Sequence, residues 1–480
     1  MKIDRQYKCS LILLCCLLLV QENFVTVTCI SNNVTPFAQQ VSGKMILAPL
    51  TRGGNLPFRR LCADFGMEVS LGEMVYARSL IKNDRIEQAR LRRAPNEKFF
   101  GVQIATNQID EGTKAIAMAA EAGADFVDLN CGCPIYEATR RGLGSSLLRS
   151  PKKLGKLVAG MVAESSKTNG GIPISVKIRL GCEASSINVN EVVQSVCDAG
   201  ASAVTIHGRT AQQGYSKAAD WDLIRDVTNE IATTNSGVPI IGNGDILTHF
   251  EANRRIESYG VDAVMVGRGA LTKPWIFQEF NSKQTWNPSL DDRIAVYRNL
   301  ALHMKDHFGD DDMGRKKSWY FLPWHFEFLS RYMYHPEEDF ATVSVDQPLI
   351  QSRSSIPTDA SPLQILLSHR SKDAHDLIAD ALWCSDSSED AVSKLCVVSE
   401  SHAFLEILKK CNESENDGDS TTELSNIPSS SKRSGGRWHK RRGRDPKPQR
   451  TPEEIAIIRA ERAAKKAASL EAEAQDMPQI

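Results

Sequence analysis

The chain has 480 residues, a length that predicts two to four domains, or fewer if one of them is an α/β barrel of about 250 residues. Hydrophobic residues make up 41% and charged residues 24%, which is ordinary for a globular protein, and the net charge of −1 favours no class of partner. The 12 cysteines are too few for a disulfide scaffold and show no zinc-ribbon spacing, so no metal site is expected.

Residues 1–40 are predicted to be a leader that is signal-like, or the product of a misassigned start codon. Basic residues precede an apolar run from Leu11 to Val20, and Val27–Cys29 could serve as a cleavage site. This is the layout of a secretory signal peptide, and the run is too short to span a bilayer. An organelle-targeting leader is the other interpretation, although the segment contains few arginines.

Residues 41–285 alternate between strand-like and helix-like segments. The predicted strands are the short apolar runs Met45–Pro49, Glu68–Leu71, Phe100–Ile104, Phe126–Leu129, Ile174–Ile178, Ala203–Ile206, Pro239–Ile241 and Ala263–Val266. Several of the intervening helical segments end in a glycine just before the next strand, as helix C-caps do. The pattern predicts a closed (β/α)8 TIM barrel. An open doubly wound sheet is the alternative, but it would place a glycine-rich phosphate loop after the first strand, where this chain has Ala48-Pro49-Leu50-Thr51.

Cys133 follows the fourth predicted strand, in the motif Asp128-Leu129-Asn130-Cys131-Gly132-Cys133-Pro134. Three roles are open to it: a buried packing residue, a nucleophile, or a general acid that gives its proton to a carbon next to a carbonyl. No Cys-His-Asn signature accompanies a nucleophile here. The rigid turn Gly132-Cys133-Pro134 would suit a thiol that is held protonated and aimed at its target.

Further polar residues end the later strands. The loops after the seventh and eighth strands, Asn243-Gly244-Asp245 and Gly267-Arg268, lie where such barrels bind phosphate. Lys177 ends the fifth strand and points inward, which is costly without a ligand such as an anionic reduced flavin ring. Gln103 and His207 also end strands and could hydrogen-bond a flavin or its phosphate, although each alone is more often an ordinary polar residue.

Residues 286–410 predict a helical domain with an extension. Leu290–His307 has the period of an amphipathic helix, and Ser318–Tyr334 is rich in aromatic residues. These aromatic side chains could form the core of a helical cap, stack nucleotides on an exposed face, or do both. Helical periodicity continues over residues 363–410.

The tail beyond the helical domain is predicted to be partly disordered. Residues 411–450 are polar, acidic and then basic, and lack an apolar face, which is typical of a disordered linker. Residues 451–480 predict a lone charged helix, with Thr451 as its N-cap and Pro452 at its first position.

From Met45 to Tyr334 the chain resembles the tRNA-dihydrouridine synthase family, through the strand-end motifs quoted above. The resemblance implies an FMN-binding barrel followed by a helical domain that binds tRNA. It also implies reduction of the C5–C6 double bond of selected uridines, with NADPH recharging the flavin. The target base would have to leave its stack to lie on the flavin.

The resemblance assigns roles to individual residues. Cys133 would give a proton to C5 of the uracil while the flavin gives a hydride to C6. Substrate contacts are expected from Asn130, Arg179 and Arg209. FMN contacts are expected from Pro49, Leu50, Thr51, Gln103, Lys177, His207, Asn243, Gly244, Asp245, Gly267 and Arg268.

Within the family, the segments Tyr215–Trp221 and Gly269–Trp275 are most similar to the eukaryotic type that modifies position 47 in the variable loop. This sequence departs from that type in lacking its CCCH zinc-finger motifs. It also has Arg140 and Arg141 where the family prefers a lysine, and an additional cysteine, Cys131.

Two other functions are compatible with a barrel of this kind. An FMN barrel acting on a free small molecule would need neither a basic helical domain nor the basic arm at 432–450, whereas tRNA binding needs such charges. The candidate phosphate contacts are Arg315, Lys316, Lys317 and Arg331. A non-catalytic RNA-binding relic of the barrel would need neither Cys133 nor Lys177.

The expected partners are therefore tRNA and NADPH, with no stable membrane contact. The expected location is cytoplasmic, because a nucleotide-dependent RNA enzyme has no substrate outside the cell. The leader leaves organelle or secretory targeting open.

Overall fold

The computed structural model describes residues 35–416 except 168–170, 234–236, 346 and 353–356. Most of the predicted leader and linker, and the whole C-terminal segment 451–480, lie outside the described residues. Within the part that is described, no helix combines the length and apolar character needed to cross a membrane.

Parallel strands close into a barrel. Within the described residues, nine strands make one sheet in the order β2-β1-β9-β8-β7-β6-β5-β4-β3, and an additional β2–β4 pairing closes eight of them into a ring. The predicted (β/α)8 TIM barrel is thus confirmed. The ring consists of β1 (Met45–Leu47), β2 (Val69–Leu71), β4 (Phe99–Ala105), β5 (Phe126–Cys131), β6 (Ile174–Arg179), β7 (Ala203–His207), β8 (Ile240–Asn243) and β9 (Ala263–Val266).

The ring departs from the sequence expectation in small ways. β3 (Val75–Tyr76) pairs with the end of β4 and so continues the second barrel strand after a break at residues 72–74. Several strands run one or two residues beyond the predicted apolar run, because hydrogen bonding between strands continues after the side chains turn polar. His207 and Asn243 are therefore the last residues of their strands.

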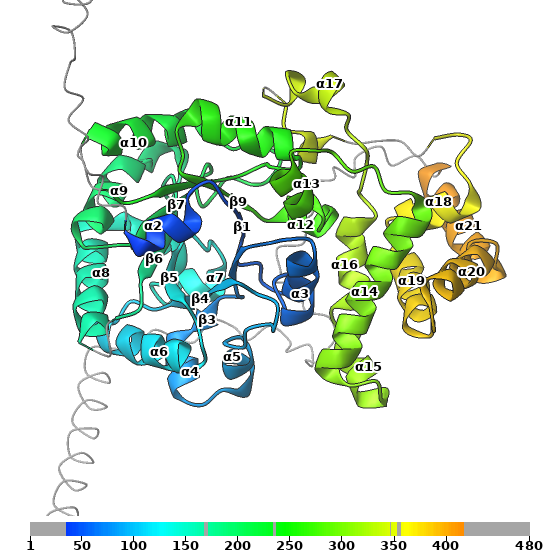
Figure 1. Cartoon of the computed structure of the whole chain (residues 1–480), viewed down its shortest axis with the longest axis horizontal. Coiled ribbons are helices and arrows are strands. Elements are labelled where there is room, and N and C mark those ends of the chain that lie inside the picture. Colours follow the sequence, from blue (N-terminus) through cyan, green and yellow to red (C-terminus); the bar gives the residue numbers. More distant parts are fainter. Residues whose placement is uncertain (1–34, 168–170, 234–236, 346, 353–356, 417–480) are drawn as a thin grey trace, which may run out of the picture. The chain divides into compact units, whose positions relative to one another are not determined.

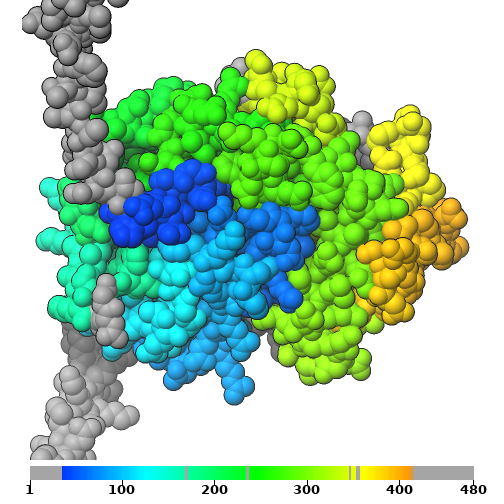
Figure 2. Space-filling model, viewed as in Figure 1, coloured from blue at the N-terminus to red at the C-terminus, as the bar shows by residue number. Residues whose placement is uncertain are grey.

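The barrel interior divides into an apolar end and a polar end. Successive strand residues point to opposite faces. At the N-terminal end, inward side chains form a small apolar cluster with α2 (Pro36–Val41), whose Phe37 ring lies 5.2 Å from that of Phe126. Figure 2 shows α2 in dark blue on the front face of the molecule. Polar groups are consequently left to the C-terminal end, where such barrels carry their active sites.

Helices surround the barrel in the expected βα order (Figure 1). Gly123, Gly200 and Gly260 have φ values of 86°, 87° and 67°, so each adopts the left-handed conformation predicted for helix C-caps. The long surrounding helices are α3 (Leu56–Asp64), α6 (Ile109–Glu121), α8 (Pro151–Ser166), α9 (Val189–Asp198), α10 (Trp221–Thr233), α11 (His249–Tyr259) and α13 (Ile276–Ser282). Short helices lie in the loops: α4 (Ala77–Ile81), α5 (Arg85–Ala89), α7 (Tyr136–Thr139) and α12 (Arg268–Thr272).

A helical region follows the barrel. It contains α14 (Leu290–Phe308), α15 (Asp312–Ser318), α16 (Leu322–Leu329), α17 (Glu337–Phe340), α18 (Pro362–Ser368), α19 (Lys372–Trp383), α20 (Ser388–Ser399) and α21 (His402–Asn416). Helix α14 packs against α3, where Arg60 Nη1 lies 2.9 Å from Asp306 Oδ2. Helix α21 continues into the segment expected to be a linker.

The aromatic-rich segment contributes mainly to the core. Phe326 is 1% exposed and Phe328 9%, and the ring of Tyr332 packs edge-on against Trp275 of the barrel at 5.0 Å. Tyr320 differs, because 58% of its surface is exposed. The interpretation as a helical core is thus correct for most of these residues, and Tyr320 leaves an aromatic surface beside it.

Candidate active site

A chain of hydrogen bonds connects three inward polar side chains of β4 and β5 at the C-terminal end of the barrel. The Asp128 carboxylate accepts one hydrogen bond from Gln103 Nε2 (2.8 Å) and another from the Ser175 hydroxyl of β6 (2.7 Å). Gln103 Oε1 in turn accepts a hydrogen bond from Asn130 Nδ2 (2.7 Å). Gln103 and Asp128 are register partners on neighbouring strands, so the sheet itself brings them together.

The last member of the chain holds the turn that carries Cys133. Asn130 Oδ1 accepts hydrogen bonds from the backbone N–H groups of Gly132 (3.3 Å) and Cys133 (3.0 Å). Asn130 is only 8% exposed, and both the oxygen and the nitrogen of its amide are hydrogen-bonded within the protein. This pairing ties the cysteine turn to the rigid strands below it.

The Cys133 thiol is half-buried, and its surroundings favour the protonated form. Burial raises its pKa, and a backbone hydrogen bond from Ile135 and the charges of Arg179 and Lys177 only partly oppose that effect. Cys131 differs, since it is fully buried in the core between the barrel and its helices. A protonated, accessible thiol can donate a proton, whereas Cys131 can only pack.

The raised pKa of Cys133 makes a measurable prediction. Iodoacetamide alkylates the thiolate form of cysteine. The alkylation rate of Cys133 in the folded protein should therefore rise with pH at higher values than that of the same cysteine in urea-denatured protein. Peptide mass spectrometry across a pH series would measure both profiles. A folded-state midpoint at or below the denatured one would contradict the protonated state assigned here.

Basic side chains gather around His207 at the end of β7. Burial lowers the pKa of His207 well below its usual range, and the charges of Arg179, Lys177, Arg209 and Arg268 lower it further. The imidazole is therefore neutral at physiological pH. Four cations near one neutral ring create a strongly positive region.

Lys177 lies inside this region and is fixed in place. Its Nζ donates a hydrogen bond to Asn243 Oδ1 (3.0 Å), and Asn243 Nδ2 donates to the Met265 carbonyl (2.7 Å). Burial, and then the charge of Arg179, lower the pKa of Lys177 to about 8. Asp128 opposes this effect with its negative charge, and although burial raises the pKa of that carboxyl to about 6, the group is still mostly ionised at neutral pH.

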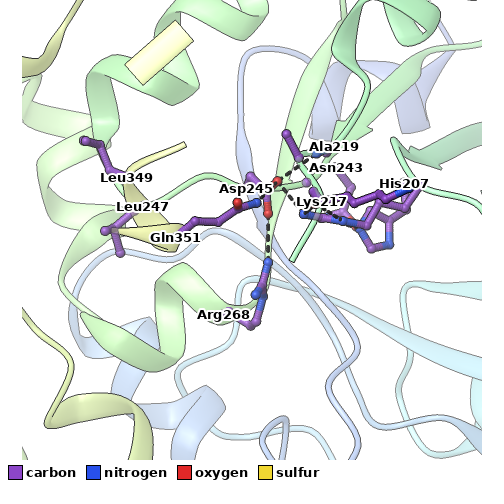
Figure 3. Close-up of polar contacts among 12 residues, drawn as sticks. His207, Lys217, Ala219, Asn243, Asp245, Leu247, Arg268, Leu349 and Gln351 are labelled. Carbon is purple, nitrogen blue, oxygen red and sulfur yellow. Dashed lines mark hydrogen bonds and ion pairs between the residues drawn. The ribbon is translucent and has the colours of Figure 1, made fainter. Parts of the chain in front are cut away.

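Asp245 connects two of the arginines, and Figure 3 shows its contact with one of them, Arg268. Its carboxylate accepts from Arg209 Nη2 (2.6 Å) through one oxygen and from Arg268 Nη2 (2.8 Å) through the other. The backbone N–H of Ala219 and the side chain of Gln351 also donate to it, at 2.8 Å and 3.3 Å. A side chain so engaged cannot bind phosphate, so any phosphate contact from Asp245 would use its backbone N–H.

The loop that carries Asp245 requires glycine. Gly244 has a φ of 140°, and a Cβ atom there would lie 2.5 Å from the Cβ of Ala219. At Gly269, an added Cβ would lie 2.1 Å from the Ile246 carbonyl oxygen. The loops after β8 and β9 therefore approach each other closely, which places the predicted phosphate-binding residues Gly267 and Arg268 beside Asn243 and Gly244.

The loop after β1 joins the same end of the barrel. A Cβ at Gly267 would lie 3.2 Å from Leu50 Cδ2, so Leu50 contacts the predicted phosphate loop. Pro49 is half-buried and Thr51 exposed beside it. The structure thus gathers residues from the loops after β1, β8 and β9 at one mouth.

Arg179 and Arg209, predicted substrate ligands, mainly contact protein groups. Arg179 Nη1 donates to the Thr210 carbonyl (2.7 Å), and Arg209, which is 0% exposed, donates to the Lys217 carbonyl as well as to Asp245. Their contact with substrate stays a prediction, as does that of Asn130.

The residues that sequence reasoning missed are Asp128, Ser175 and Gln351. The first two occupy inward positions of predicted strands, so the two-residue period could have indicated them. Gln351 lies well beyond the barrel segment and has no motif around it. Nothing in the sequence therefore indicated that it contacts a residue of the barrel.

Comparisons with known proteins identify the family. The family model described as dihydrouridine synthase (Dus) matches residues 46–328. The chain therefore belongs to the dihydrouridine synthase family, as its strand-end motifs predicted.

The names of curated relatives are more specific than the description of the family. The chain is 40% identical over 300 residues to a tRNA-dihydrouridine(47) synthase of Coprinopsis cinerea, covering 61% of this chain and 44% of that protein. It is 37% identical over 294 residues to a tRNA-dihydrouridine(47) synthase-like protein of Homo sapiens, covering 61% and 44%. Both names include NAD(P)(+). The chain thus matches less than half the length of these relatives.

Proposed function

We propose that this protein reduces a uridine of tRNA to 5,6-dihydrouridine with the help of FMN and NADPH. The observation that carries the proposal is the position of a half-buried, protonated thiol, Cys133, at the same barrel mouth as a cluster of buried and half-buried cations. Membership of the dihydrouridine synthase family supports the same reaction.

The residues at the mouth suit FMN as an anionic ligand. Lys177, Arg179, Arg209 and Arg268 outnumber the acids Asp245 and Asp128 among the described residues around His207, and burial makes such an excess of positive charge costly without an anion. Bound there, FMN would supply a hydride to C6 of the uracil after reduction by NADPH.

Groups of the protein itself would bind the cofactor and donate the proton. Arg268, with the glycine-containing loops after β8 and β9, would bind the phosphate. Lys177 would lie beside the flavin ring and favour its negative charge. Cys133 would hold a proton within reach of C5 of the base, which is the geometry a general acid requires.

The region 286–410 would bind the tRNA, while residues 41–285 form the catalytic barrel. Lys316 and Lys317 extend from α15, and Arg52 of the barrel stacks on the exposed ring of Tyr320 at 4.2 Å. Arg315 and Arg331 are paired with Asp380 and Glu327, so they would have to exchange these partners for phosphates. By likeness to the curated relatives, the target would be position 47.

A reconstitution experiment tests the proposal. The purified protein should absorb as a flavoprotein, and NADPH should bleach that absorption. Incubation with tRNA from cells that lack the gene should restore dihydrouridine, and mass mapping should place it at position 47. A flavin-loaded protein that is reduced by NADPH but forms no dihydrouridine in that tRNA would refute the proposal.

A further inference from the structure

We infer that Asp128 is a positioning residue: through Gln103 and Asn130, its carboxylate sets the orientation of the turn that presents Cys133. This inference rests on the proposed function and extends it to a residue that touches neither thiol nor base. Asp128 is fully buried on β5, below the mouth.

The argument begins with the direction of the hydrogen bonds. An ionised carboxylate can only accept, whereas a side-chain amide has one accepting and one donating end and can be reversed. Because Asp128 accepts from Gln103 Nε2, Gln103 Oε1 must face Asn130, where it accepts from Nδ2. Asn130 therefore presents its oxygen to the turn.

That oxygen is what the turn needs. The backbone N–H groups of Gly132 and Cys133 both point at Asn130 Oδ1. If the Asn130 amide reversed, its NH2 group would face these two donors, and the turn would lose its acceptor. The Asp128 carboxylate thus fixes the direction of each hydrogen bond in the relay formed by Asp128, Gln103 and Asn130. The last bond of this relay reaches the backbone of Cys133.

The relay is rigid at its origin. The second oxygen of Asp128 accepts from the Ser175 hydroxyl on β6, so the carboxylate is held from both neighbouring strands. A general acid displaced by about 1 Å can lose about 100-fold in rate. Loosening the relay should therefore affect proton delivery more than flavin binding.

Three variants separate positioning from packing. Asp128→Ala removes the acceptor, Asp128→Asn keeps an oxygen for Gln103 and can donate to Ser175, and Ser175→Ala leaves the Gln103 contact in place. We expect Asp128→Ala to slow uridine reduction by roughly 10- to 100-fold. Asp128→Asn should restore most of the rate, and Ser175→Ala, which frees only one oxygen of the carboxylate, should slow the reaction less than Asp128→Ala does.

The two half-reactions provide the discriminating readout. Stopped-flow absorption of the flavin measures its reduction by NADPH and, separately, its reoxidation by tRNA. Asp128→Ala should slow only reoxidation and should change the alkylation rate of Cys133, with the exposed Cys396 as an internal reference. Thermal unfolding checks that each variant folds.

The outcomes are distinct. Reoxidation by tRNA that is as fast in Asp128→Ala as in the wild type would overturn the inference, as would equal slowing of both half-reactions, which indicates a merely structural role. If the wild-type protein itself makes no dihydrouridine, the proposed function fails. The alkylation comparison would still decide whether Asp128 positions the thiol.

Discussion

Replacing Cys133 with alanine should leave the flavin bound and reduce dihydrouridine formation by roughly 10²- to 10⁴-fold, the contribution typical of a positioned general acid. The side chain packs at the edge of a small apolar cluster and makes no hydrogen bond to the cations that the structure describes around His207, so its loss should remove a proton donor without displacing them. Flavin absorption of the purified variant and mass mapping of the tRNA product measure the two effects separately.

Cys131→Ala is the matched control, because it removes a thiol two residues away. Cys131 is buried among apolar side chains on the outer face of the barrel strand, so its loss should lower stability but keep turnover. Full activity of Cys133→Ala would exclude the acid role. Loss of the flavin from that variant would place the sulfur in cofactor binding instead.

Replacing Arg268 with methionine should weaken FMN binding by roughly 10- to 150-fold, since a hydrogen bond to a charged group contributes about 1.5–3 kcal/mol. Its guanidinium is oriented by Asp245 at 2.8 Å and lies 3.9 Å from the centre of the Tyr215 ring. Methionine keeps the length of the side chain but removes the charge. Titration of the apoprotein, followed by quenching of flavin fluorescence, gives the dissociation constant.

Riboflavin, which lacks the phosphate, sharpens that test. If Arg268 binds the phosphate, riboflavin should bind the wild type and Arg268→Met equally well. Arg225→Met serves as the control, because Arg225 is on α10 and pairs with Asp222 and Asp226 on the surface. An equal loss of riboflavin and FMN affinity would show that Arg268 contacts the ring or shapes the loop.

The barrel could be predicted from the sequence because each feature that defines it lies within a few consecutive residues. Each strand is a short apolar run, and each glycine cap requires a backbone conformation that other residues adopt at a cost. The strand-end motifs could be predicted for the same reason, since parallel strands bring their C-terminal ends to one mouth. Cys133, Lys177 and Arg268 all lie there.

The interactions between these residues could not be predicted. Gln103 meets Asp128 only because of the register between β4 and β5, and register is decided by the whole closed ring. Asp245 looks like a phosphate ligand in the sequence, yet its carboxylate is engaged by Arg209 and Arg268. Such pairings depend on distances between loops that no local pattern encodes.

The segment that includes Leu349 and Gln351 limits how this protein can be shortened. Leu349 is 3% exposed and packs on Leu247 and Phe250, while Gln351 reaches the Asp245 carboxylate (Figure 3). Both lie beyond residue 328, where the match to the family ends. A version trimmed to residues 46–328 would expose Leu247 and Phe250 to solvent and would remove one of the donors to Asp245. A shortened protein intended to keep these contacts should therefore extend at least to Gln351.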